Sequence, residues 1–126
     1  MNKMLIISHG DLGQELLNTA KKIIGDFSPE FISAISNKDL SLADIIGIIT
    51  DITVKDPDNF YILATDFPGG SCFIASKKVS SSSDRIITIS GLNISMILSF
   101  LTKRNNYSGK ELAEIIKIDG NRAIIS

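Results

Sequence analysis

The sequence has little cysteine and little histidine. Its 126 residues contain one cysteine, Cys72, and one histidine, His9. With a single cysteine no intramolecular disulfide can form, and nothing points to an oxidising compartment. The same count excludes metal sites built from several Cys or His ligands. We expect no metal and no other cofactor.

The sequence also lacks an excess of charge and a long apolar run. Lys and Arg number 13 and Asp and Glu 14, whereas nucleic-acid-binding domains usually carry a dense basic face. No apolar stretch is long enough to cross a bilayer, and the start MNKMLIISHGD is too polar for a secretory signal. We therefore expect a cytoplasmic protein without a nucleic-acid partner, folded as one domain over residues 1–126.

Four short runs rich in apolar residues recur along the chain. They are KMLIIS (3–8), FISAIS (31–36), FYILAT (60–65) and RIITIS (85–90). Three of them are nearly continuous in apolar residues, which is typical of strands covered on both faces. A parallel sheet is therefore predicted.

Helical patterns follow each of these runs. The first, after residue 8, has apolar residues on one face, Asp11 and Gln14 at the spacing of a capping box, and Gly25 at its end. The other expected helical segments are 41–53, 70–79, 93–103 and 108–118.

The last residues, NRAIIS (121–126), are predicted to form a short final strand. Two of the helical segments repeat the capping-box spacing, Ser41 with Asp44 and Ser108 with Glu111. The whole order predicts a doubly wound α/β domain with a mainly parallel central sheet flanked by helices.

Loops at one rim of this sheet contain the candidate functional residues. In an open parallel sheet, ligands collect outside the carboxyl ends of the strands. The residues expected there are His9, Gly10, Asp66, Phe67, Gly69, Gly70, Ser71, Gly91 and Asn93. Glycines let backbone amides approach a ligand closely, and helix N-termini favour an anion.

This combination favours phosphoryl transfer through histidine. A neutral imidazole is a competent nucleophile, and a carboxylate bound to one ring nitrogen leaves the lone pair of the other nitrogen free. His9 is the candidate nucleophile and Asp66 the candidate orienting carboxylate. The hydroxyl of Ser71 and the amides of the Gly-Gly-Ser segment are candidate donors to the phosphoryl oxygens.

Each of these residues also has a purely structural interpretation. A lone histidine is often structural or simply exposed, Asp66 suits a helix cap or a loop, and Gly69 and Gly70 suit a tight turn. Cys72 is interpreted as a small buried filler, because nothing in the sequence indicates a lowered thiol pKa.

Other functional classes are less well supported by the residues. A hydrolase using Ser71, His9 and Asp66 would lack the G-x-S-x-G turn that such folds normally use. A receiver domain would need an acidic pair for magnesium in the loop after the first run, and that pair is missing. A non-catalytic binding or regulatory module stays open.

Three segments together resemble the IIA components of mannose-family sugar phosphotransferase systems. IISHGDLGQELLNTAKKIIG (6–25) is similar to the opening of that family, in which a strand ends in His-Gly. ATDFPGGSCFIAS (64–76) resembles its second block, an aspartate followed by Gly-Gly-Ser, and SGLNISMILSFL (90–101) resembles its third. The resemblance spans essentially the whole chain. It departs from the family at Cys72 and Ser95, where many members have proline.

The resemblance implies a phosphohistidine carrier. His9 would accept a phosphoryl group from phospho-HPr and pass it to a IIB component, and membrane IIC and IID components would then act on a mannose-type sugar. Asp66 would hydrogen-bond His9, Ser71 would donate to the phosphoryl group, and Phe67 would be an apolar anchor for partners. The family fold also implies a homodimer that exchanges the short C-terminal strand.

The sequence does not distinguish this carrier from one related protein. The phosphocarrier subunit of dihydroxyacetone kinases would share the fold and the histidine, but it would deliver the phosphoryl group to a bound nucleotide rather than to a IIB component.

Overall fold

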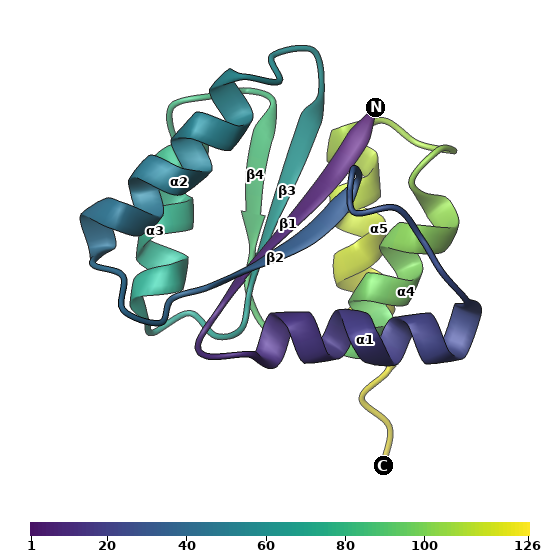
Figure 1. Ribbon diagram of the computed structural model, residues 1–126. Coiled ribbons are helices and arrows are strands. Elements are labelled where there is room, and N and C mark those ends of the chain that lie inside the picture. Colours follow the sequence, from purple (N-terminus) through teal and green to yellow (C-terminus); the bar gives the residue numbers. More distant parts are fainter.

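The computed structural model describes residues 1–126, in which strands and helices alternate until two helices end the chain (Figure 1). In order, the elements are β1 (Asn2–Ser8), α1 (Leu12–Ile24), β2 (Ile32–Ser36), α2 (Leu42–Val54), β3 (Phe60–Thr65), α3 (Ser71–Ser80), β4 (Ile86–Ile89), α4 (Ile94–Lys103) and α5 (Gly109–Arg122). None of the helices combines the length and the apolar character needed to span a bilayer.

The four strands form one parallel sheet in the order β2-β1-β3-β4. The chain leaves β1 toward one edge and then crosses back to build the other edge from β3 and β4. This reversal is the switch point of a doubly wound sheet, and it places the carboxyl ends of β1 and β3 side by side. The predicted α/β class, with a parallel sheet flanked by helices, is confirmed.

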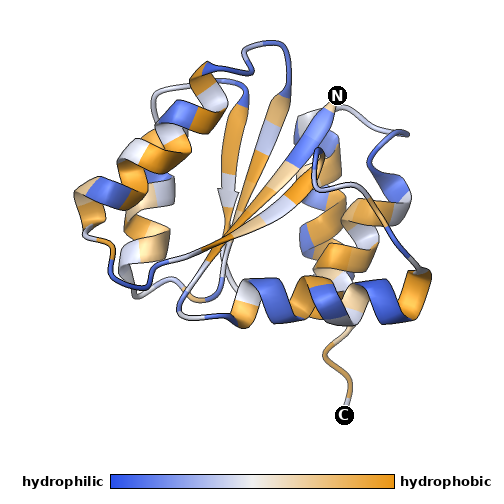
Figure 2. Cartoon of the chain, in the orientation of Figure 1, coloured by the Kyte–Doolittle hydropathy of each residue, from blue (hydrophilic) through white to orange (hydrophobic).

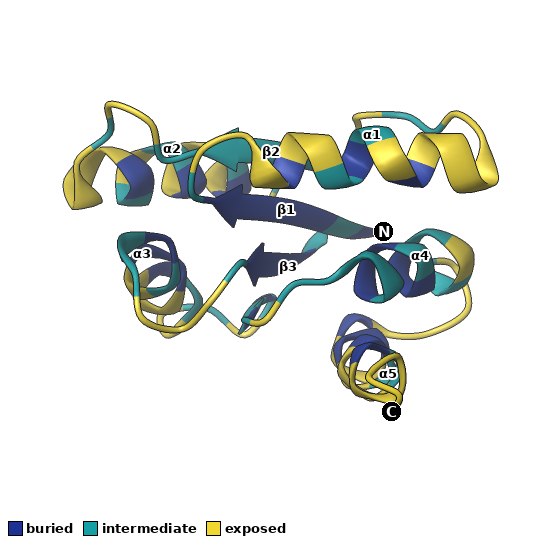
Figure 3. Ribbon diagram, turned by 90° about the horizontal axis from the view of Figure 1, so that it is seen from below, coloured by how far each residue is buried: buried dark blue, intermediate teal, exposed yellow.

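Helices cover both faces of the sheet. α1, α4 and α5 lie on one face, and α2 and α3 lie on the other (Figures 1 and 3). Alternate strand residues serve the two cores: Met4 and Ile6 face the first group of helices, whereas Leu5 and Ile7 face the second. The strands are therefore largely apolar, while the helices alternate polar and apolar patches (Figure 2).

The predicted strand bounds agree with the structure to within one residue at each end. β2 is less buried than its sequence suggests, because only its first residue is fully covered. Its place at the edge of the sheet explains this exposure.

The two later capping boxes are confirmed. The Asp44 N–H donates to Ser41 Oγ at 3.1 Å, and the Ser41 N–H donates to Asp44 Oδ2 at 3.0 Å. Ser108 and Glu111 make the same reciprocal pair. These contacts satisfy backbone N–H groups that have no partner within the helix.

The capping box predicted for the first helix is wrong. Asp11 makes no side-chain cap, and the Gly13 N–H instead donates to Ser8 Oγ at 2.8 Å. α1 packs so closely on β1 that a Cβ at Gly13 would lie 2.7 Å from Ile6 Cγ2. The end of β1 therefore caps the helix that follows it.

The predicted final strand is absent from the single chain. α5 continues through Arg122, and residues 123–126 form no strand. Gly120 lies within the helix, where an added Cβ would lie 2.5 Å from Met96 Cγ. A strand needs a neighbouring edge for its backbone hydrogen bonds. Residues 123–126 pair with no strand, and Ile124 and Ile125 are 80% and 86% exposed.

Candidate active site

His9 and Asp66 meet at the switch point of the sheet. His9 follows β1 directly, Asp66 follows β3 directly, and the two strands are hydrogen-bonded neighbours with Ile7 opposite Thr65. Two buried strands thus deliver one polar side chain each to the same edge, which Figure 3 views from below. The position agrees with the rim expected from the sequence.

The Asp66 carboxylate holds the His9 ring. His9 Nδ1 lies 2.8 Å from Asp66 Oδ2, and the His9 backbone N–H donates to the same oxygen at 2.9 Å. The Phe67 backbone N–H donates to Oδ1 at 3.0 Å. The Asp66 side chain is 8% exposed and the His9 side chain 40%, so a buried carboxylate carries an accessible imidazole.

The charge of Asp66 determines which ring nitrogen is free. Burial by itself would raise the pKa of this carboxyl group, but hydrogen bonds from the His9 backbone, the His9 ring and the Phe67 N–H outweigh it and hold the pKa below its usual value. The ionised carboxylate can only accept hydrogen bonds. Nδ1 therefore carries the shared proton, and the lone pair is on Nε2.

Two neighbours pack against the imidazole. The Phe67 ring lies 5.1 Å from the His9 ring between centroids, at an angle of 37°. A Cβ at Gly70 would lie 2.6 Å from His9 Cε1 and 2.9 Å from Nε2. The φ of Gly70, −115°, suits any residue, so close contact with the ring is what requires glycine here.

α3 begins beside the ring without a side-chain cap. Gly70 is the N-cap, and the first bond into the helix runs from the Ile74 N–H to the Gly70 carbonyl at 3.2 Å. The backbone N–H groups of residues 71–73 therefore have no helical acceptor. A helix start of this kind carries a positive partial charge and binds phosphate and other anions.

The structure adds Cys72 to the surroundings of His9 and Asp66. Its sulfur, a ring nitrogen of His9 and a carboxylate oxygen of Asp66 all lie within 4.8 Å of one another. Burial, and then the charge of Asp66, raise the pKa of the Cys72 thiol to about 11. At neutral pH the thiol is protonated and is not a nucleophile. Its burial matches the interpretation from sequence, and its place next to Ser71 in the sequence put it beside the proposed site.

Gly10 and Gly69 lie in the loops that follow β1 and β3. Gly10 has a φ of 56°, in the left-handed region that favours glycine, and its N–H donates to Asn37 Oδ1 at 3.1 Å. A Cβ at Gly69 would lie 2.9 Å from the ring of Phe67. Ser71 is the first residue of α3, and no hydrogen bond joins its hydroxyl to His9.

Asn93 has a structural role instead. Its Oδ1 accepts the Met96 N–H at 3.0 Å and so caps α4, while its Nδ2 donates to the Gly120 carbonyl at 3.2 Å. These bonds join α4 to α5 and engage both ends of the amide. The structure does not place Asn93 in contact with His9.

The contact between Gly70 and the ring gives a sharp prediction. In Gly70→Ala the added methyl group must displace the imidazole at Cε1 and Nε2, because both atoms are closer than a Cβ normally comes. We expect any reaction at Nε2 to slow by about 100-fold, as small misplacements of reacting groups do. The rate of modification of His9 by diethyl pyrocarbonate, followed by absorbance, measures the accessibility of the ring directly.

Gly47→Ala is the matched control for this substitution. Gly47 lies exposed within α2, and an added Cβ would meet nothing within 4 Å. Alanine there should raise stability by about 0.5–1 kcal/mol and leave His9 modification unchanged. Equal modification rates in the Gly70→Ala and Gly47→Ala proteins would contradict the prediction.

One family model matches most of the chain. A family model described as the PTS system fructose IIA component matches residues 3–117. No curated protein sequence matches significantly.

Several solved structures have the same fold. The phosphotransferase system component EIIA from Streptococcus agalactiae superposes with a TM-score of 0.90 at 22% identity, covering 100% of this chain and 97% of that one. A PTS IIA protein associated with the fucose utilization operon of Streptococcus pneumoniae gives a TM-score of 0.84 at 19% identity, with 99% and 92% covered. The mannose/sorbose-specific IIA subunit from Enterococcus faecalis gives 0.84 at 19%, with 99% and 93% covered.

Proposed function

Because the chain belongs to the family of PTS fructose IIA components, we propose that it is a phosphohistidine carrier of a sugar phosphotransferase system. His9 accepts a phosphoryl group from phospho-HPr and delivers it to a IIB component. The observation that supports this best is the His9 ring itself, with Nδ1 bound to Asp66 and Nε2 beside the uncapped start of α3.

The proposed reaction takes place at Nε2. Its lone pair forms the new bond to phosphorus, while the bond from phosphorus to the donor histidine breaks and its electron pair returns to the donor ring. The proton on Nδ1 stays in the hydrogen bond to Asp66. The phosphorylated ring, which is cationic, thus keeps a countercharge at 2.8 Å, and transfer to the IIB component reverses these steps.

Donors at the start of α3 stabilise the phosphoryl group in this proposal. The charge of the transferred group is spread over its equatorial oxygens, and fixed N–H groups stabilise this charge without reorganisation. The backbone amides of residues 71–73 and the hydroxyl of Ser71 supply these donors from the helix start beside Nε2. Asp66 stays 8% exposed behind the ring, away from the incoming anion.

The surface around His9 suits a protein as the reaction partner. Phe67, whose ring packs against His9, and Leu12, the first residue of α1, are 49% and 46% exposed. The three cavities of the structure are lined by residues other than His9, Asp66 and Phe67. An open rim with an exposed aromatic side chain can be covered by the apolar centre of a partner interface.

We also place the carrier in the cytoplasm, where its contact with the membrane components is indirect. HPr and the IIB component act in the cytoplasm, so the carrier belongs there and meets the IIC and IID components only through IIB. Those components, rather than this chain, then select the mannose-type sugar.

Labelling with purified upstream components tests the carrier function. The protein is mixed with phosphoenolpyruvate, the first enzyme of the pathway and HPr, and we expect one acid-labile, base-stable phosphoryl group on His9. Loss of the label on adding a IIB component, but not on adding a nucleotide-loaded dihydroxyacetone kinase subunit, selects the sugar system. No labelling with active upstream components would overturn the proposal.

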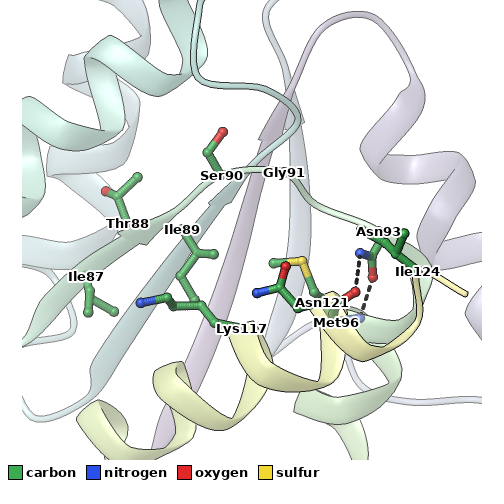
Figure 4. A pocket seen from close by; sticks show the side chains of 11 residues that line it. Ile87, Thr88, Ile89, Ser90, Gly91, Asn93, Met96, Lys117, Asn121 and Ile124 are labelled. Carbon is green, nitrogen blue, oxygen red and sulfur yellow. Dashed lines mark hydrogen bonds between the residues drawn. The ribbon is translucent and has the colours of Figure 1, made fainter.

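We also propose that two copies exchange their last residues. β4 is an edge strand, and a cavity of about 420 Å³ lies beside it between Ile87, Ile89 and the end of α5 (Figure 4). In Figure 1 the C-terminal residues extend away from the body of the molecule. An exposed strand edge and a short apolar segment are complementary parts of a strand-exchanged dimer.

Removal of residues 123–126 tests the exchange. The full chain should sediment as a dimer and the shortened chain as a monomer, because the deletion removes Ile124 and Ile125, whose burial against the partner would stabilise the dimer. Ile118→Ser, a change at a residue that is 46% exposed on α5, is the control and should leave the dimer intact. A monomeric full chain, or a dimeric shortened one, would contradict the exchange.

A further inference from the structure

One residue of a cluster at the site is not used by the proposed carrier reaction. His9, Asp66 and Cys72 bring together an imidazole, a carboxylate and a thiol, whose ligating atoms lie within 4.8 Å of one another. The carrier uses the first two and has no use for the third. Three such donors are the usual protein ligands of Zn²⁺, which is held by sulfur, nitrogen and oxygen atoms.

We propose that His9, Asp66 and Cys72 form a binding site for Zn²⁺, and that occupation of this site prevents phosphorylation of His9. Binding of the ion stands on the geometry alone, whereas its effect on phosphorylation rests on the proposed carrier function.

The distances are close to those of a zinc site. Ligand atoms about 2.0–2.3 Å from a tetrahedral zinc ion lie roughly 3.4–3.7 Å from one another. His9 Nδ1 and Asp66 Oδ2 are 2.8 Å apart and the widest separation in the cluster is below 4.8 Å. An ion seated between them therefore needs shifts of about 1 Å, which rotation of the Cys72 side chain and of the His9 ring can supply.

Charge and access also fit a divalent cation. A thiolate and a carboxylate together carry two negative charges, which Zn²⁺ neutralises in a buried place. Cys72 gives up its thiol proton to the solvent when the ion binds, as zinc-bound cysteines do. The ion enters past His9, whose side chain is 40% exposed, and a water molecule completes four-fold coordination on that open side.

The proposed inhibition follows from the imidazole. A metal ion on Nδ1 takes the place of the proton that Asp66 now accepts, and the single N–H proton of the neutral ring then resides on Nε2. Nε2 loses its lone pair and cannot attack phosphorus. The ion would thus block the reaction without covering Nε2.

Cobalt spectroscopy tests the site without using phosphorylation. Co²⁺ added to the full chain should give a sulfur-to-metal charge-transfer band in the near ultraviolet and intense visible bands of a tetrahedral ion, and Zn²⁺ should bleach both. Cys72→Ser and Cys72→Ala should lose the charge-transfer band and bind Zn²⁺ at least about 100-fold more weakly, since loss even of an outer-shell partner can cost that much. Both variants are measured, so that a folding defect in one of them does not decide the test.

Asp119→Asn is the matched control. Asp119 is another partly buried aspartate, bound to Ser99 and Lys103 at 2.6 Å each, and its loss should leave the cobalt spectrum unchanged. No thiolate band in the unaltered chain, or equal Zn²⁺ affinity in folded Cys72→Ser, would overturn the site.

Preformed phospho-HPr, freed of the enzyme that made it, tests the effect on phosphorylation. Zn²⁺ should stop transfer to the unaltered chain, a chelator should restore it, and Cys72→Ser should be phosphorylated with or without the ion. Normal phosphorylation of a chain that shows the cobalt band would refute inhibition while leaving the site. Failure of metal-free protein to accept phosphate would instead refute the carrier function.

Discussion

Replacing His9 with glutamine is expected to abolish phosphorylation by phospho-HPr. Glutamine keeps a polar side chain of similar length, but its amide nitrogen has no available lone pair for attack on phosphorus. His9 is the only histidine of the chain, so no second imidazole can take its place. We expect the rate to fall by more than about 10⁴-fold, as loss of a nucleophile does, measured by gel shift or mass spectrometry at alkaline pH.

The fold should tolerate this change. The His9 side chain is 40% exposed, and Asp66 keeps its bonds from the His9 and Phe67 backbone N–H groups, so stability should fall by about 1 kcal/mol. Asn37→Ala is the control, because it removes the hydrogen bond to Gly10 beside His9 but leaves the ring pair intact. Phosphorylation of folded His9→Gln at an unchanged rate would show that another residue carries the phosphoryl group.

The parts of the fold that follow from local pattern could be predicted from the sequence. Strand bounds agree because apolar runs of this length have to be covered on both faces, and the parallel order then follows from the helices between them. The meeting of His9 and Asp66 was also predictable, since each follows a strand directly and carboxyl ends of parallel strands share one edge. The sequence pattern did not show that His9 Nδ1 and Asp66 Oδ2 lie 2.8 Å apart.

Contacts between elements were the part that could not be predicted. Asp11 had the spacing of a cap, but the hydroxyl of Ser8 occupies that role because α1 packs tightly on β1. Cys72 resembled a core residue, and it is one, yet only the position of α3 relative to β1 and β3 brings its sulfur near His9. Asn93 was expected at the binding rim, and its hydrogen bond to the start of α4 is a contact that this expectation did not include.

The C-terminal residues form no strand in the single chain. Their apolar and β-branched composition predicted a strand, but a strand needs a pairing partner, and residues 123–126 pair with no strand of their own chain. The helix therefore continues to Arg122, and two isoleucines stay exposed. The composition of the segment favours a strand, but it does not show which strand the segment pairs with.

Replacing Asp66 with asparagine is expected to slow phosphorylation of His9 by about 10³- to 10⁴-fold, the scale seen when a carboxylate that orients a histidine becomes an amide. Asp66 accepts three hydrogen bonds, two at Oδ2 from His9 and one at Oδ1 from Phe67. Asparagine has only one oxygen to accept them. Its NH₂ group must face either the Phe67 N–H or the two donors of His9.

Both orientations of asparagine are unfavourable for transfer. If the NH₂ group faces His9, Nδ1 has to accept a hydrogen bond, and the ring proton moves to Nε2, the attacking atom. If the oxygen faces His9, the tautomer survives, but the phosphorylated cationic ring has no countercharge beside it and two N–H donors oppose each other at Phe67. The rate of phosphorylation, and the ¹⁵N chemical shifts of Nδ1 and Nε2, distinguish these cases.

The contrast with Asp119→Asn separates this effect from general damage. Asp119 also has a pKa lowered by hydrogen bonds, first from Lys103 and then from Ser99, and its amide variant should lose comparable local bonding at a distance from the ring. We expect that variant to accept phosphate at the normal rate, with unchanged ring shifts. If Asp66→Asn and Asp119→Asn were phosphorylated equally fast, Asp66 would merely support the loop, and the lone pair on Nε2 would have to be maintained by some other group.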